Sequence, residues 1–188
     1  ETSELDDADY SNNPKDRCFA CKKELHKQTT YFSKKLNYKN VLDGVNLDDL
    51  GDYRPGIQAA KNAGVISPLA KFEVSKNDIR DISRALGFPW WDKPAQPCLS
   101  SRFTYGDKIT HQRLKMVEKA EEYITKRGIL EVRVRSQGST ARIEVPKDDL
   151  KKFFDKYDFD ELVNYFSNLG FKCISLDLEG LISGKLNR

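Results

Sequence analysis

The chain has 188 residues, of which 38% are hydrophobic, enough to bury one sizeable core or two small ones. Its 32 basic and 29 acidic residues leave a formal charge of +3, so the overall charge argues against a nucleic-acid partner. No apolar run approaches the roughly 20 residues that span a bilayer, and no signal peptide opens the chain, so we expect no membrane partner and a cytoplasmic protein.

The N-terminal region combines a polar lead-in with a predicted helix that carries two cysteines. Residues 1–16 are rich in carboxylates and are interpreted as a lead-in or linker, and Asp16 is a candidate N-cap for a helix from Arg17 to about Leu36. Cys18 and Cys21 then share one face of the first turn, where the positive helix end favours thiolates. In a reducing compartment this Cys-x-x-Cys spacing is typical of metal-binding or catalytic cysteines. Two alternatives stay open, namely cysteines packed under the helix start and a zinc site that includes His26.

The next stretch alternates short apolar runs with helical patterns. Residues 40–44 and 65–66 are predicted strands, residues 57–63 are a predicted helix, and Ser75 caps a predicted helix over 76–86 that stops at Gly87. This alternation favours an α/β fold with a parallel sheet covered by helices.

A loop dense in carboxylates follows the first of these strands. Because ligands of open α/β sheets bind beyond the carboxyl ends of the strands, Asp48 and Asp49 are candidate ligands for Mg²⁺ or a ribose. An acidic loop facing only solvent is the alternative.

Cys98 lies in a loop stiffened by Pro94 and Pro97, which disfavour a helix or a paired strand there. Arg102 and Lys108 add positive charge that favours the thiolate, the form that acts as nucleophile or metal ligand. A half-buried loop cysteine without chemistry is the alternative. The pair Trp90-Trp91, at the entrance of the loop, either walls a pocket or packs on the core.

A second unit is expected over residues 106–188, after a first unit over 17–105. It comprises a helix over 111–126 capped by Thr110, a hairpin that turns at Gly138-Ser139, helices over 147–154 and 159–168, and a strand over 171–178 that holds a structural Cys173. The hairpin turn places Val134 opposite Ile143, which makes one face apolar.

The other face of this hairpin is charged. Arg133 is expected opposite Glu144, and Arg135 opposite Arg142. Two facing guanidinium groups repel each other, so we expect a bound phosphate or carboxylate between them. Two arginines splayed into water are the alternative.

Taken together, motifs spread over nearly the whole chain resemble one family, the LarE family of ATP-dependent sulfur transferases in the pyrophosphatase-loop (PP-loop) superfamily. The motifs are Cys18-Phe19-Ala20-Cys21-Lys22, residues 44–56, residues 91–102, Arg133-Val134-Arg135 and Leu176-Asp177-Leu178-Glu179-Gly180. The resemblance implies the remainder of a parallel-sheet, Rossmann-like PP-loop domain followed by a small α+β domain for substrate binding and oligomerisation, and a homo-oligomer.

The resemblance also implies an activity, the synthesis of a nickel-pincer nucleotide precursor. A pyridinium mononucleotide carboxylate, the small-molecule substrate, would be adenylated by ATP with Mg²⁺, and sulfur would then replace AMP to give a thiocarboxylate. In some members of the family, the cysteine that corresponds to Cys98 gives up its own sulfur. In members with an added Cys-x-x-Cys, three cysteines hold a [4Fe-4S] cluster, and the presence of Cys18, Cys21 and Cys98 favours this catalytic sulfur donor.

Further site residues follow from the resemblance. Lys22, Arg133 and Arg135 would surround the substrate phosphate or the leaving AMP, and Asp48 or Asp49 would line the same cavity. Arg102 and Arg142 are added as candidate cofactor-binding residues, and Glu144 is added from the hairpin register.

One departure from the family pattern bears on activity. The Ser-Gly-Gly-x-Asp-Ser loop that holds the ATP phosphates does not occur in the sequence. Either it belongs to a longer polypeptide that precedes Glu1, or nucleotide activation has been lost. We expect this chain alone to bind ATP poorly.

Two other functions compete with this one. A cluster-dependent tRNA thiolase of the same superfamily would need a broad basic surface, which the near-neutral charge disfavours. A non-catalytic module would use the three cysteines only to hold zinc or a cluster.

Overall fold

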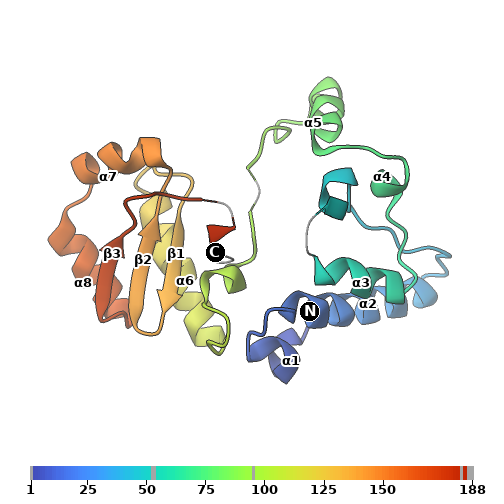
Figure 1. The fold of residues 1–188 in the computed structure, drawn as a ribbon, viewed down its shortest axis with the longest axis horizontal. Helices are drawn as coiled ribbons and strands as arrows, with labels where there is room; N and C mark the ends of the chain where they lie inside the picture. Colours follow the sequence, from blue (N-terminus) through green and yellow to red (C-terminus); the bar gives the residue numbers. More distant parts are fainter. Residues whose placement is uncertain (1, 52–53, 95, 183, 186–188) are drawn as a thin grey trace. The chain divides into compact units, whose positions relative to one another are not determined.

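A computed structural model of the chain describes residues 2–51, 54–94, 96–182 and 184–185 (Figure 1). The chain divides into two compact units, Glu1–Gln96 and Pro97–Arg188. The two units divide between residues 96 and 97, before the expected boundary between residues 105 and 106, so Cys98 belongs to the second unit.

The first unit is mainly helical, and its largest internal contact joins α2, Arg17–Lys35, to α3, Pro55–Asn62. The predicted helix over 17–36 is therefore confirmed. The expected lead-in is folded, since it forms η1, Glu4–Asp6, and α1, Ala8–Ser11, and both pack against α2. Tyr10 and Asn13 are buried there.

The remaining elements of this unit are short. They are η2, Leu47–Gly51, α4, Pro68–Lys71, and α5, Lys76–Ala85. Helix α5 begins with the expected cap, in which Ser75 and Asp78 exchange hydrogen bonds in a capping box. None of its described residues is buried.

The residues that the structure describes form no extended parallel sheet in the first unit. The predicted strands over 40–44 and 65–66 are reduced to one parallel bridge between Leu42 and Ile66. Their side chains are 60% and 39% exposed. Two short strands without further neighbours do not bury enough apolar surface to extend into a stable ladder.

The second unit is a three-stranded sheet with helices packed on it. Its elements are η3, Leu99–Arg102, α6, His111–Thr125, β1, Arg133–Gln137, β2, Thr140–Glu144, η4, Lys147–Asp149, α7, Leu150–Lys156, α8, Phe159–Leu169, and β3, Cys173–Leu176. Strand β2 is central, antiparallel to β1 and parallel to β3 (Figure 1). Helix α6 packs against β1 and α8 against β3, which gives the mixed α/β fold.

The predicted hairpin register is confirmed. Arg133 pairs with Glu144, Val134 with Ile143, and Arg135 with Arg142. Gly138 turns the chain with a φ of 56°, which glycine adopts without strain. Val134 and Ile143 are buried in the core with Val117 and Ile124 of α6, as the apolar pattern of that helix indicates.

Candidate functional site

The Cys98 loop ends at η3, and Cys98 is the N-cap of that short helix. The residue is exposed, and its carbonyl accepts a hydrogen bond from the Ser101 amide at 3.0 Å. A helical turn thus follows directly after the cysteine, while Ser100 and Phe103 beyond it are buried and anchor the loop. The thiol is presented on a fixed backbone, as the flanking prolines predict.

The side chain of Arg102 fixes the backbone of this loop through hydrogen bonds. The residue is 6% exposed, and its Nη1 donates to the carbonyl oxygens of Pro97 at 2.8 Å and Cys98 at 3.2 Å. Its Nε and Nη2 donate to the two carboxylate oxygens of Glu121 at 2.8 and 3.0 Å. A bidentate pair of this kind fixes orientation as well as distance. Arg102 therefore acts on the cysteine through the backbone.

Glu121 connects the cysteine loop to the arginine strand. Its Oε1, which already accepts from Arg102, also accepts from the backbone amide of Val134 at 2.8 Å. Val134 lies between Arg133 and Arg135, so one carboxylate of α6 ties the cysteine loop to the strand that carries both arginines. Our sequence reasoning missed Glu121. The signal was its spacing, because it shares a helical face with Val117 and Ile124.

Arg135 adds a second link between the same two segments. Its Nη1 donates to the Ser101 carbonyl at 2.6 Å, and its Nε donates to Glu144 Oε2 at 2.9 Å. The side chain is 3% exposed and that of Glu144 is fully buried. A buried charge pair is maintained only when its remaining polar atoms are satisfied, and here the loop carbonyl contributes to that.

The anion expected between Arg135 and Arg142 is supplied by the protein itself. Glu144 accepts from Arg135 on one oxygen and from Arg142 Nη2 on the other, at 3.0 Å. The sequence argument was therefore wrong to require an external anion at this position, and the splayed alternative is wrong for Arg135. Glu144 is placed opposite Arg133 by the register, and its buried carboxylate reaches diagonally to Arg135.

Arg133 differs from its neighbours. It is half-buried, and among the described residues none forms a hydrogen bond or ion pair with its guanidinium group. Burial lowers its pKa, and the nearby Arg135 and Arg102 lower it further, against the opposing effect of Glu144 and Glu121. A partly desolvated guanidinium next to other cations favours an anionic ligand.

The other expected ligands lie in the first unit. Cys18 is exposed and Cys21 is half-buried in the first turns of α2, three residues apart as predicted. Lys22 follows on the same helix and is exposed. The start of α3 approaches this turn closely, since a Cβ on Gly56 would lie 2.9 Å from Lys22 Cγ. Glycine therefore permits the close packing of the two helices at the cysteines.

Asp48 and Asp49 are used within the first unit. Asp48 accepts from the Lys76 amide at 2.6 Å at the start of α5, and Asp49 forms an ion pair with Arg54 at 2.8 Å. Asp49 also accepts from the Asn46 amide at 3.2 Å. Both carboxylates therefore have local partners, and their role toward Mg²⁺ or a ribose stays a prediction.

The residues present match the donor chemistry of an iron-sulfur cluster, since thiols supply the ligands and two of them lie together on one helical turn. Within the residues that the structure describes, however, no three cysteine, histidine or carboxylate side chains gather as a metal site. Cys98 belongs to the second unit, whereas Cys18 and Cys21 belong to the first.

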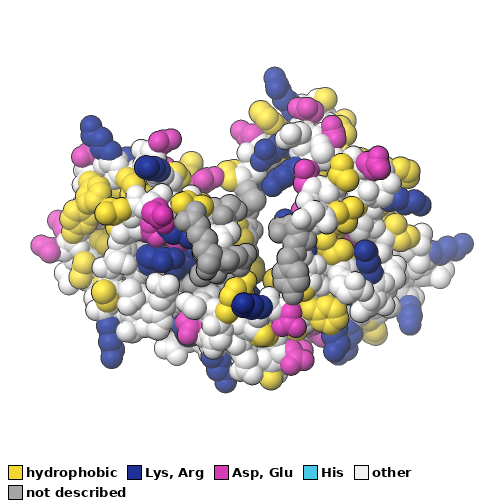
Figure 2. Space-filling view, in the orientation of Figure 1, with side chains coloured by type: hydrophobic (Ala, Val, Ile, Leu, Met, Phe, Trp, Pro, Cys, Tyr) yellow, Lys and Arg dark blue, Asp and Glu magenta, His cyan; other side chains and the backbone are white. Residues whose placement is uncertain are grey.

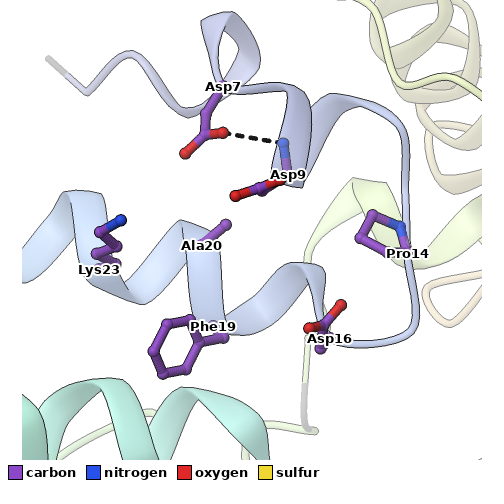
Figure 3. Close-up of a pocket in the computed structure, with 7 residues that line it drawn as sticks. All are labelled: Asp7, Asp9, Pro14, Asp16, Phe19, Ala20 and Lys23. Carbon is purple, nitrogen blue, oxygen red and sulfur yellow. Dashed lines mark hydrogen bonds between the residues drawn. The ribbon is translucent and has the colours of Figure 1, made fainter.

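Two cavities of the first unit involve α2. One of 280 Å³ is lined by Asp7, Asp9, Asp16 and Lys23, among others (Figure 3). Asp7 there caps α1 by accepting from the Asp9 amide. The other, of 590 Å³, lies where α2 meets α3 and includes the 4% exposed His26.

His26 is buried without a hydrogen-bond partner on either ring nitrogen among the described residues. Burial lowers its pKa, and Lys22 lowers it further, although Asp43 opposes this. The neutral imidazole is thus the form that this packing favours. No thiol lines the cavity, so the zinc alternative that included His26 gains no support there.

Comparison with known proteins identifies the family. An uncharacterized protein of Synechocystis is 52% identical over 188 residues, which are 100% of this chain and 70% of that protein. The pyridinium-3,5-bisthiocarboxylic acid mononucleotide synthase of Lactiplantibacillus plantarum is 36% identical over 184 residues, 97% of this chain and 66% of the synthase. This chain belongs to the LarE family.

An uncharacterized protein of Methanocaldococcus jannaschii is 35% identical over 167 residues, which are 89% of this chain and 64% of that protein. The chain therefore spans about two thirds of the length of these relatives. No family model matches it. In the part of the chain that the structure describes, no helix combines the length and apolarity needed to cross a membrane.

Proposed function

We propose that this LarE family member acts in the conversion of a pyridinium mononucleotide carboxylate to a thiocarboxylate. ATP with Mg²⁺ would activate the carboxylate as an adenylate, and sulfur would then replace AMP. The activity for which the Lactiplantibacillus relative is named, synthesis of a pyridinium-3,5-bisthiocarboxylic acid mononucleotide, supports the substrate class. The observation that carries the proposal is the connection of the Cys98 loop to the arginine strand through Arg102, Glu121 and Arg135.

This connection matters because sulfur transfer requires the donor and the acceptor to be held in a fixed relation. The backbone of Cys98 and the backbone of the strand that carries Arg133 are fixed by one hydrogen-bonded network within one unit. Arg133 would bind the substrate phosphate or the AMP that leaves. Arg135, Arg102 and Arg142 are engaged with carboxylates of the chain and would hold the network in place.

For the source of sulfur, we propose a [4Fe-4S] cluster bound by Cys18, Cys21 and Cys98. Three thiolates leave one iron without a protein ligand, and this position could carry the sulfide that is transferred. Lys22, next to the cysteine pair, would assist with the negative charge of the substrate. Asp48 and Asp49 are the proposed ligands on the Mg²⁺ side.

The test combines metal analysis with product analysis. Protein purified without oxygen should contain about four irons and labile sulfide per chain, and Cys98→Ser should lose most of this iron. Zinc in place of iron would support the non-catalytic module. Mass spectrometry after incubation of the full-length protein with ATP, Mg²⁺ and the pyridinium mononucleotide dicarboxylate should show oxygen replaced by sulfur in the nucleotide. If Cys98 instead loses one hydrogen sulfide and becomes dehydroalanine, the cluster is not the donor.

Thiolation of tRNA is the second candidate function, and it is supported only because such enzymes also use three cysteines. On the face in view in Figure 2, basic and acidic side chains are interspersed rather than separated. Recognition of a folded RNA needs an extended run of positive charge along the phosphate backbone. Formation of thiolated tRNA in the same incubation would overturn the small-molecule assignment.

A further inference from the structure

The segment after β3 carries charged residues that the proposed site does not use. Its backbone is fastened to β2, because the Asp177 amide donates to the Ile143 carbonyl and the Leu181 amide to the Val145 carbonyl, each at 2.8 Å. Gly180, at a φ of 79°, packs so closely that a Cβ there would lie 3.0 Å from the Val145 oxygen. The position of Asp177 beside the arginine network is therefore fixed by the backbone.

Two cations share the carboxylate of Asp177. Lys185 Nζ donates to its Oδ2 at 2.6 Å, and both side chains are about nine-tenths buried. Arg142 Nε lies 3.5 Å from the same oxygen. This Nε is buried and has no hydrogen-bond partner among the described residues, so Arg142 forms only a long ion pair with Asp177, whereas Lys185 donates a hydrogen bond to it.

This competition reaches the proposed anion site through Glu144. Arg142 donates to Glu144, and Glu144 is the cross-strand partner of Arg133. Arg142 contacts the two carboxylates through different atoms, Nη2 with Glu144 and Nε with Asp177. If a hydrogen bond from Nε to Asp177 drew Nη2 away from Glu144, Glu144 would keep only Arg135 and would be drawn toward Arg133. A carboxylate of the chain would then compete with the substrate anion for Arg133.

We propose that Lys185 and Asp177 are positioning residues for the guanidinium site. Lys185 occupies Asp177, Arg142 therefore stays on Glu144, and Arg133 stays available to an anionic substrate. The role as a substrate site rests on the proposed function, whereas the competition for Asp177 does not.

The direct test is the side-chain signal of Arg142 Nε–H in an NMR spectrum of the whole chain. In Lys185→Met, which keeps the apolar stem, Arg142 should donate to Asp177, so its Hε should move downfield and exchange more slowly. Lys185→Arg should restore the signal. Lys126→Met removes a charge from an exposed pair with Glu122 in the same unit and should leave the signal unchanged.

Titration with nicotinic acid mononucleotide, a pyridinium mononucleotide carboxylate, gives the second readout. We expect its Kd to rise about three- to tenfold in Lys185→Met and to recover in Lys185→Arg. An Arg142 signal that does not move in Lys185→Met, or moves equally in Lys126→Met, overturns the proposal. So does an equal loss of affinity in both Lys185 variants, because that indicates packing of the segment alone. If no protein binds the nucleotide, the wild type included, the proposed function fails, and the Arg142 signal still decides the competition.

Discussion

Glu144 is a fully buried carboxylate between two arginines, and its replacement gives the sharpest prediction for this unit. Glu144→Gln keeps the size of the side chain and removes its charge. Arg135, which is 3% exposed, then keeps a buried positive charge without a counter-charge. Removing one partner of such a pair costs about 3 to 5 kcal/mol. We expect about 3 kcal/mol, because Arg142 is 26% exposed and can turn toward water or Asp177.

Hydrogen exchange of the backbone amides of β1 and β2 measures this loss in the second unit alone. A loss of about 3 kcal/mol corresponds to roughly a hundredfold fall in protection. The matched control, Glu122→Gln, breaks an exposed pair with Lys126 and should change protection by less than about fivefold. The double variant Arg135→Met/Glu144→Leu should recover most of the loss, because apolar replacement of a whole buried pair is tolerated. A fall below about threefold for Glu144→Gln would refute the reasoning.

Three further predictions concern single side chains of the same unit. Arg102→Lys keeps the charge but loses the bidentate contact with Glu121, so the reaction of Cys98 with a thiol reagent should become several-fold faster as the loop loosens. Burial raises the pKa of Tyr157 to about 12, so its phenol should titrate there by ultraviolet absorbance, and stability should fall above pH 10 as the unfolded chain ionises first. Arg133→Met should stabilise β1 by about 0.5 to 1 kcal/mol in the same exchange measurement and abolish nucleotide binding, and unchanged binding would contradict its role.

The hairpin shows what the sequence predicts well. Side chains in a strand alternate with a period of two, so a turn at Gly138 and one apolar face leave a single register for Val134 and Ile143. The helix ends at Ser75 and Thr110 were predictable for a similar reason, because capping depends on a few neighbouring residues.

The contacts of the charged residues were not predictable in the same way. The register places Glu144 opposite Arg133, yet its buried carboxylate accepts hydrogen bonds from Arg135 and Arg142. Glu121 depends on how α6 packs against β1, which no local pattern determines. The strands expected around Leu42 and Ile66 are reduced to a single bridge. A strand is stable only with neighbouring strands, which an apolar run does not provide by itself.

Arg133 differs from the three other arginines of this network because no carboxylate among the described residues pairs with it. Arg102 is matched by Glu121, and Arg135 and Arg142 share Glu144 with Asp177 close to the latter, so each of these guanidinium groups is held by carboxylates of the fold. A network that was only structural would be expected to match Arg133 as well, since an unmatched, half-buried charge is costly. Because the carboxylates near it are already engaged, the site keeps one positive charge beside a fixed cysteine loop. Under the proposed function, an anionic substrate would supply the missing counter-charge, and its binding would be favoured only where the network keeps Glu144 away from Arg133.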